Sequence, residues 1–249
     1  MLENGLLGNN NPRHEHDDDN EDEHKLSIVY DLDALDHAFV AVQKQFPSHF
    51  RHCFAVKSCP LLCVLNRAVS HGLGLECASR IEVILALKSG CCATNIVFDS
   101  PCKTRGDLKF ALKHGISINA DSLDEIEVIH EIIMKHHLHE DEKPLKSMIA
   151  LRLNPLLGLG TNAYLSVSNL TSKFGVPLTK CNRNRVLDVF RAHPWLTALH
   201  CHVGSQGCSL QMLAQGAHVL NGLADEIDAA IGCRRIQVRV ECIAVPDVS

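Results

Sequence analysis

The stretch Phe54-Ala55-Val56-Lys57-Ser58-Cys59-Pro60 begins with a short apolar run. The run leads to a lysine, and a proline follows three residues later. The apolar residues predict a buried strand, and the proline suits the first turn of a helix, where an N–H would have no partner. Lys57 is therefore expected at the carboxyl end of a strand, where α/β barrels keep their active sites. An ammonium held partly out of water loses its proton more easily, and the free amine can condense with an aldehyde. Taken alone, the motif also fits a surface lysine that ends a strand.

From residue 26 onward, apolar strand segments alternate with amphipathic helical segments. This alternation predicts a parallel sheet with covering helices. The expected strands are residues 28–30, 54–57, 72–76, 95–99, 117–121, 148–153, 196–203 and 236–244. The first expected helix begins at Asp31 or Asp33 and ends near Pro47, and the others span residues 61–71, 79–89, 104–114, 123–137, 183–192 and 210–231.

The order of these elements predicts an α/β fold of the TIM (β/α)8 type. Without the run at 28–30 the pattern contains seven strands, and eight close a barrel. An open doubly wound sheet is the competing architecture, but no G-x-G-x-x-G follows the first strand. Seven strands left open would also expose two apolar edges. We therefore expect a barrel that is incomplete at its C-terminal end.

The first 25 residues differ from the rest in composition. Residues 13–25 carry seven carboxylates, one arginine and one lysine, so their formal charge of −5 equals that of the whole chain. We expect a disordered acidic, histidine-rich tail over residues 1–25 and one barrel domain over residues 26–249. The neutral body argues against nucleic acid or an anionic membrane as a partner. His14, His16 and His24 could hold a divalent metal, but such runs usually only solubilise, and no metal site is predicted.

The twelve cysteines are scattered along apolar segments and show no paired C-x-x-C spacing. The N-terminus lacks the basic and apolar regions of a signal peptide, and no apolar run approaches the length of a membrane span. Reduced core thiols are therefore expected, which places the protein in the cytoplasm or in an organelle stroma. The neighbours Cys201 and His202 cannot hold one zinc ion together, because adjacent strand residues face opposite ways.

Polar residues stand where the expected strands end, at Lys57, Glu76, Asp99, Asp121, Arg152, His202 and Ser205. Singly, each fits a helix cap or an ion pair, and Asp121 before Ser122 is interpreted as a cap. In a barrel the strand ends converge on one opening. Together these side chains predict a small anionic ligand bound beside a reactive amine.

Five blocks in order carry a resemblance to a known family: Phe54-Ala55-Val56-Lys57, then GLGLECASRIE at 72–82, SPCK at 100–103, SKFG at 172–175 and HVGSQ at 202–206. The chain resembles the ornithine/diaminopimelate/arginine decarboxylases. These fold-type III enzymes use pyridoxal 5'-phosphate and combine an alanine-racemase-like barrel with a β-domain. The resemblance covers residues 28 to about 210.

The resemblance implies roles for individual residues. Lys57 would form the Schiff base with the cofactor, and His202 would stack on its ring. Ser205 would help bind its phosphate, while Arg152 and Glu82 would support the ring and the lysine. The substrate would be a small amino acid that loses CO₂, with Lys57 and His202 as catalytic residues. The full-length form is expected to be a homodimer.

Several positions depart from the family pattern. Glu76, counted here among the cofactor-binding residues, stands where the family usually has aspartate, and its extra methylene extends the carboxylate into the pocket. A displacement of about 1 Å can reduce activity about 100-fold. Cys59 and Ser100 stand where the family has asparagine. Residues 243–249 lack the family's glycine triplet, and the β-domain is absent, so the chain is expected to be catalytically silent alone.

The substrate is less determined than the reaction. SPCK at 100–103 resembles the ornithine branch, whereas RLNP at 152–155, YLS at 164–166 with SKFG at 172–175, and Gln206 are more similar to diaminopimelate enzymes. A diaminopimelate decarboxylase-like enzyme is favoured. The alternatives are an ornithine or arginine decarboxylase-like enzyme, and a non-catalytic regulatory relative that binds a full-length decarboxylase.

Overall fold

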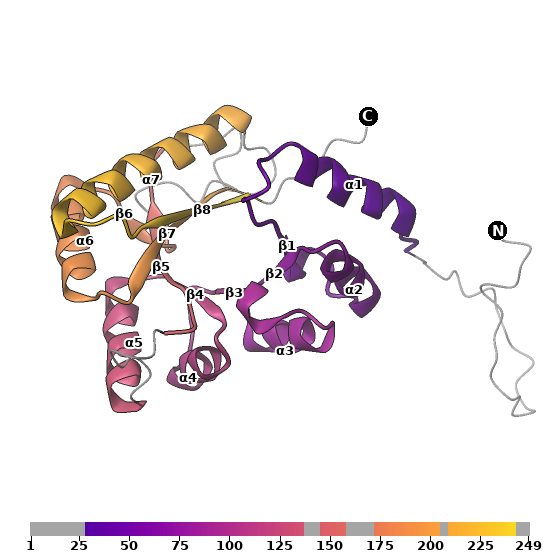
Figure 1. Cartoon of the computed structure of the whole chain (residues 1–249), viewed down its shortest axis with the longest axis horizontal. Coiled ribbons are helices and arrows are strands. Elements are labelled where there is room, and N and C mark those ends of the chain that lie inside the picture. The colour runs from indigo at the N-terminus through magenta and orange to yellow at the C-terminus, as the bar shows by residue number, and fades with distance from the viewer. Residues whose placement is uncertain (1–27, 137–144, 158–171, 205–208, 243–249) are drawn as a thin grey trace, which may run out of the picture. The chain divides into compact units, whose positions relative to one another are not determined.

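The computed structural model describes residues 28–136, 145–157, 172–204 and 209–242. The chain divides into two compact units, residues 1–32 and 33–249, and all strands belong to the second (Figure 1). The acidic tail predicted for residues 1–25 lies outside the described residues. The strand predicted at 28–30 is wrong: the first described residues form no strand, and Ile28 and Val29 are 75% and 88% exposed. An apolar run becomes a strand only when a neighbour satisfies its backbone groups.

The seven other predicted strands are confirmed. They are β1 (Cys53–Ala55), β2 (Gly74–Cys77), β3 (Ile96–Asp99), β4 (Ser117–Ala120), β5 (Ile149–Asn154), β7 (Leu196–Gly204) and β8 (Gln237–Cys242). Every neighbouring pair is parallel, and the strands follow one another in sequence order from β1 to β8. The two-residue strand β6 (Val176–Pro177) was not predicted and pairs with the end of β5. Within the described residues β1 and β8 do not pair, so the strands form an open path.

Seven helices connect the strands or precede them. They are α1 (Leu32–Lys44), α2 (Leu62–Ser70), α3 (Arg80–Lys88), α4 (Arg105–His114), α5 (Leu123–His136), α6 (Lys180–Ala192) and α7 (Leu210–Ile231), with 3₁₀ turns η2 (Val56–Ser58) and η3 (Ala93–Asn95). Figure 1 shows α2 to α7 along the outer side of the curved run of strands. No helix in the described part of the chain is both long and apolar enough to cross a bilayer.

Local sequence determines where these helices begin and end. Thr104 and Asp107 form a capping box at the start of α4, and Gly115, at φ 73°, ends the helix in the left-handed region that favours glycine. Helix α6 begins at Lys180, three residues before the predicted start, because the Thr179 hydroxyl accepts a hydrogen bond from the Asn182 amide.

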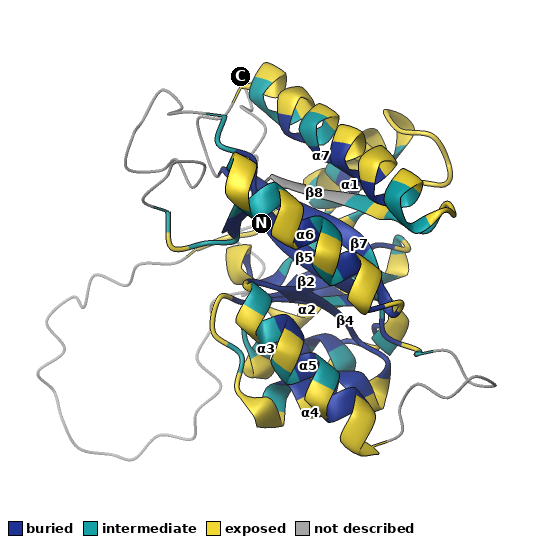
Figure 2. Cartoon of the chain, turned by 90° about the vertical axis from the view of Figure 1, so that its left-hand side faces the viewer, coloured by how far each residue is buried: buried dark blue, intermediate teal, exposed yellow. Residues whose placement is uncertain are grey.

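The two faces of the sheet differ in chemistry. In-register residues of parallel strands share a face, and so do residues two apart on one strand. The outer face carries fully buried apolar side chains such as Leu75, Ile118 and Leu151, which belong to the core that the helices cover. Figure 2 shows buried residues along the strands and on the helix sides turned toward them.

The opposite face carries polar side chains that are equally buried. Glu76 pairs in register with Val97, two residues before Asp99, which itself pairs with Asn119. Arg152 on β5 pairs in register with His200 on β7. The buried polar residues of this inner face are Glu76, Asp99, Ser117, Asn119, Arg152, Asn154, His200 and His202. The sheet therefore gathers the predicted functional side chains on one surface.

Candidate functional site

Lys57 lies in the 3₁₀ turn η2, immediately after β1. The turn is held by the Ser58 hydroxyl, which donates to the Ala55 carbonyl at 2.6 Å, and by the Cys59 amide, which donates to Val56. The Lys57 Nζ lies 3.2 Å from Glu76 Oε2 and 3.4 Å from Oε1. The lysine side chain is 33% exposed and the glutamate side chain 7%. The longer Glu76 side chain thus reaches the lysine, which keeps one side accessible to a ligand.

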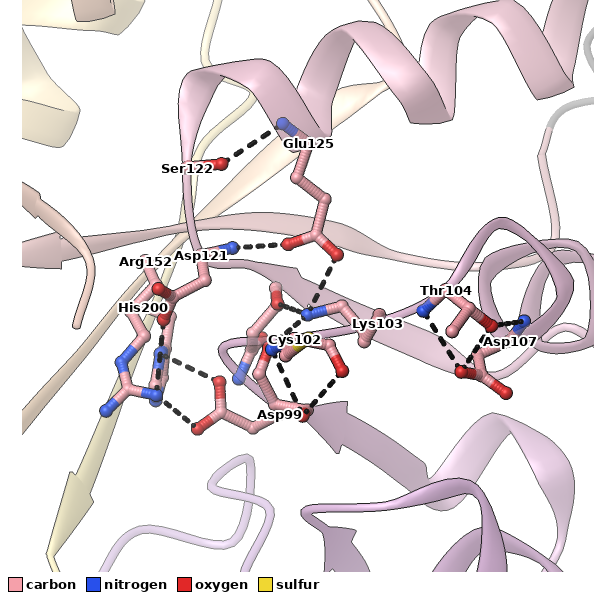
Figure 3. Close-up of polar contacts among 12 residues, drawn as sticks. Asp99, Cys102, Lys103, Thr104, Asp107, Asp121, Ser122, Glu125, Arg152 and His200 are labelled. Atoms are coloured by element: carbon pink, nitrogen blue, oxygen red, sulfur yellow. Dashed lines mark hydrogen bonds and ion pairs between the residues drawn. The ribbon is translucent and has the colours of Figure 1, made fainter. Parts of the chain in front are cut away.

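Arg152 occupies the centre of a buried charge cluster on the same face (Figure 3). Its Nη1 lies 3.0 Å from Asp99 Oδ2 and 3.5 Å from Asp121 Oδ1, and all three side chains are nearly fully buried. Its guanidinium carbon lies 4.8 Å from the centre of the Phe174 ring. Burial raises the pKa of Asp121 although Arg152 opposes this shift. Two carboxylates and one aromatic face engage this cation, which leaves little of it for a ligand.

His200 was missing from the predicted site. Its Nδ1 lies 3.7 Å from Asp99 Oδ1, and its side chain is 3% exposed. The signal that could have identified it is its spacing from His202, because residues two apart on a strand share a face. His202 is likewise buried, at 8% exposure. Cys201, between the two histidines, belongs to the outer apolar core. It therefore faces away from His202, as expected for adjacent strand residues.

The interpretation of Asp121 as a helix cap is wrong, because the next residue has that role. The Ser122 hydroxyl accepts from the Glu125 amide at 3.1 Å, and the Glu125 carboxylate accepts from the Asp121 amide at 2.7 Å. The Ser122 hydroxyl therefore caps α5, and the Glu125 side chain reaches back to the residue before the cap. The Asp121 carboxylate is therefore free to turn toward Arg152.

Lys103, in the SPCK segment, joins three elements through an ammonium that is completely buried. Its Nζ donates to the Ser100 carbonyl at 2.5 Å and to the Asn119 carbonyl at 2.8 Å, and it lies 3.1 Å from Glu125 Oε1 (Figure 3). Burial raises the pKa of Glu125, while Lys103 acts in the opposite direction. The SPCK motif by itself predicts no role for this lysine. In the structure, its hydrogen bonds link the chain after β3 to the end of β4.

Two predicted site residues lie elsewhere or cannot be placed. Glu82 accepts a hydrogen bond from the Ala78 amide at 2.7 Å, and its own amide donates to Ser79, so it caps α3. Ser205 lies outside the described residues. In the described part of the chain, no three His, Cys, Asp or Glu side chains are arranged to hold a metal ion.

Comparison with known proteins gives this geometry a context. Residues 32–238 match the family model for the pyridoxal-dependent decarboxylases, pyridoxal binding domain. A diaminopimelate decarboxylase from Pseudomonas aeruginosa is 29% identical over 188 residues, which cover 75% of this chain and 44% of that protein. The diaminopimelate decarboxylase from Haemophilus influenzae is 32% identical over 160 residues, or 64% of this chain and 37% of that protein. The chain spans less than half the length of either relative.

Solved structures confirm the expected barrel-type fold. A mutant diaminopimelate decarboxylase from Helicobacter pylori, complexed with L-lysine, aligns with a TM-score of 0.73 at 22% identity, over 86% of this chain and 62% of that one. The arginine decarboxylase of Paramecium bursaria Chlorella virus, bound to agmatine, aligns with a TM-score of 0.65 at 18% identity, over 86% of this chain and 53% of that one. At these identities the likeness is one of fold.

Proposed function

The chain belongs to the pyridoxal-dependent decarboxylase family, and we propose that it binds pyridoxal 5'-phosphate through Lys57 as the cofactor-binding part of an amino-acid decarboxylase. The observation that supports this most strongly is the Lys57–Glu76 pair at 3.2 Å, placed at the strand ends within the matched residues. A covalent link to an aldehyde needs a primary amine that a ligand can reach. Lys57 meets that need because a third of its side chain is exposed.

The inner face fits the proposed cofactor in its donor set. It offers an amine at Lys57, a carboxylate at Glu76 and an imidazole at His202, which suit an aromatic aldehyde with a ring to be held in place. We propose that Ser205, outside the described residues, binds the phosphate. Glu82 would act indirectly, because its cap on α3 holds the chain directly after Glu76 and β2.

The residues of this chain would each perform a limited task. Glu76 lies within reach of Lys57 Nζ and can accept the proton that the ammonium must lose before it reacts. His202 would fix the tilt of the cofactor ring, and the buried surroundings of the strand ends would keep water from the reacting atoms. When bound, the cofactor takes up the electron pair that the departing carboxylate leaves behind. Arg152 would not contact the substrate, because Asp99 and Asp121 already occupy it.

For the substrate, we propose a diaminopimelate-like amino acid. Support comes from the two curated relatives, both named diaminopimelate decarboxylase, and from the L-lysine that the Helicobacter pylori structure holds. Ornithine and arginine remain the alternatives, since the viral relative is an arginine decarboxylase bound to agmatine. A homodimer is proposed for the full-length form.

CO₂ release tests the proposed reaction and ranks the substrates. The longest expressed form of the protein is incubated with pyridoxal 5'-phosphate and separately with meso-diaminopimelate, L-ornithine, L-arginine and L-lysine. We expect the greatest release from meso-diaminopimelate, with Lys57→Ala as the inactive control. Turnover of ornithine alone would reverse the ranking. Absence of turnover with all four, together with co-purification of a full-length decarboxylase, would favour the regulatory alternative.

We also propose one domain over residues 26–249 and a reducing compartment for the protein. In the described part of the chain, eight cysteines are present as free thiols, at positions 59, 63, 77, 91, 92, 102, 181 and 233. Free thiols fit the cytoplasm or an organelle stroma. Mass spectrometry of freshly isolated, unreduced protein checks this, and several intramolecular disulfides would contradict it.

A further inference from the structure

Resting on the proposed function, we infer that Asp99 and Phe174 are positioning residues for the cofactor site. They act through Arg152, which they hold against residues 172–175. We call the group formed by Asp99, Asp121, Arg152, Phe174 and Gly175 the Arg152 clamp. Its members come from the ends of β3, β4 and β5 and from the segment before β6, so the clamp joins parts of the chain that are far apart in sequence.

The Arg152 clamp contains more negative than positive charges when its carboxyls are ionised. Arg152 carries one positive charge, whereas Asp99 and Asp121 carry two negative charges when ionised. All three side chains are at most 9% exposed. Removing such groups from water is costly, and replacing a buried ion pair by apolar residues often leaves stability unchanged or improved. Stability alone therefore does not explain the buried cluster. We attribute to it a second role, which is to hold the surrounding chain in one arrangement.

Residues 174–178 lie against Arg152 and the end of β5. The Phe174 ring lies 4.8 Å from the guanidinium carbon of Arg152, and the Gly175 backbone acts to lower the pKa of the Asp121 carboxyl. Gly175 has a φ of 68°, and a Cβ there would lie 3.1 Å from the Arg152 carbonyl oxygen. The Leu178 amide then donates to the Asn154 carbonyl at 2.9 Å. The segment is thus fixed against the end of β5 by the arginine and its backbone.

Asp99 connects the clamp with the proposed cofactor site. Asp99 contacts both Arg152, at 3.0 Å, and His200, at 3.7 Å. His200 lies two residues before His202 on the same face of β7. A change at Asp99 therefore loosens two things at once: the segment at 172–175 and the support beneath His202. Phe174 affects only the first, which makes the two residues separable by mutation.

Hydrogen exchange of the cofactor-free protein tests the clamp itself. We compare Asp99→Asn and Phe174→Leu with the matched control Glu226→Gln, which also turns a carboxylate into an amide but in the exposed pair with Arg183. We expect the amides of Gly175, Val176 and Leu178 to exchange about tenfold faster in both clamp variants, the change that one lost hydrogen bond allows. The Ile118 amide, bonded to the Met148 carbonyl, reports on the sheet and should not change.

The Kd and the absorption band of the bound cofactor distinguish a positioning role from a purely structural one, because a purely structural role would leave both unchanged. Asp99→Asn should raise the Kd for pyridoxal 5'-phosphate about tenfold or more and shift its visible absorption band. Phe174→Leu should weaken binding less, and Phe174→Tyr should restore it, because a phenol ring keeps the same contact with Arg152.

The outcomes separate the two proposals. If the wild-type protein takes up no cofactor, the proposed function fails while hydrogen exchange still tests the clamp. If exchange rises equally at Gly175, Val176 and Leu178 and at Ile118, or if cofactor affinity and spectrum match the wild type, the positioning role is overturned. If Asp99→Asn does not fold, the pair Phe174→Leu and Phe174→Tyr decides by the same measurements.

Discussion

Replacing Lys103 by methionine removes the buried ammonium while keeping a chain of similar length. The side chain has no exposed surface, and its Nζ contacts the Ser100 carbonyl at 2.5 Å, the Asn119 carbonyl at 2.8 Å and Glu125 Oε1 at 3.1 Å. The substitution leaves two carbonyls without this donor and one buried carboxylate without its cation. Removing one partner of a buried pair costs about 3–5 kcal/mol, and we expect a loss of unfolding free energy in that range.

The double variant Lys103→Met/Glu125→Gln separates the cost of the two carbonyls without a donor from the cost of the buried carboxylate without a cation. Because burial already raises the pKa of Glu125, the carboxyl in Lys103→Met can escape its unpaired charge by binding a proton. The loss in the single variant should therefore shrink as pH falls toward 4. In the double variant the charge is gone, so the loss should be smaller at pH 7 and should depend less on pH.

Urea unfolding followed by tryptophan fluorescence measures these differences. Trp195 is the only tryptophan of the chain and is 4% exposed in the folded protein. Arg183→Met is the matched control, because its pair with Glu226 is largely exposed and should contribute about 1 kcal/mol or less. If Lys103→Met loses no more than this control, Lys103 does not tie β3 to β4 and the reasoning is refuted.

Two further predictions concern single ionisable groups. The Thr94 hydroxyl, 3.2 Å from the exposed Cys92 thiol, lowers the pKa of Cys92, whereas burial raises the pKa of Cys91 to about 11. Iodoacetamide at pH 8 should label Cys92 before Cys91, because about 10⁻³ of Cys91 is present as thiolate at that pH. Thr94→Val should lower the labelling rate of Cys92, and equal labelling rates of the two thiols in peptide maps would contradict the prediction. Burial raises the pKa of Asp121 above its ordinary 3.8, so the folded state keeps a proton that the unfolded chain releases. The stability that this bound proton gives the folded state is therefore lost as pH rises through the raised pKa. Asp121→Asn should gain stability relative to the wild type over that interval in urea titrations, and a difference independent of pH would count against the shift.

The strands could be predicted because their two faces obey different rules. Apolar residues such as Leu75 and Leu151 are required on the outer face by the helices, and the polar residues between them mark the inner face. The run at 28–30 has similar composition but forms no strand, because β structure depends on a partner that local sequence does not supply. The strand β6 is too short to show any periodicity, and its pairing is set by the end of β5.

The site could be predicted less completely than the fold. Lys57, Glu76 and Arg152 were placed correctly at the strand ends, yet their partners were not predicted. Whether the Asp121 carboxylate turns toward Arg152 depends on whether Asp121 or Ser122 caps the next helix, and the geometry of the turn decides this. Both residues are good caps by type, so composition alone cannot distinguish them.

The most direct measurement is where the cofactor becomes attached. The protein is incubated with pyridoxal 5'-phosphate, reduced with borohydride and digested, and the modified peptides are sequenced by mass spectrometry. The account predicts stoichiometric label on Lys57, abolished in Lys57→Ala, and less label in Glu76→Gln, which removes the carboxylate 3.2 Å from the amine. Equal uptake by the Lys57→Ala protein, or label spread over exposed lysines with Lys57 unmodified, would contradict the account.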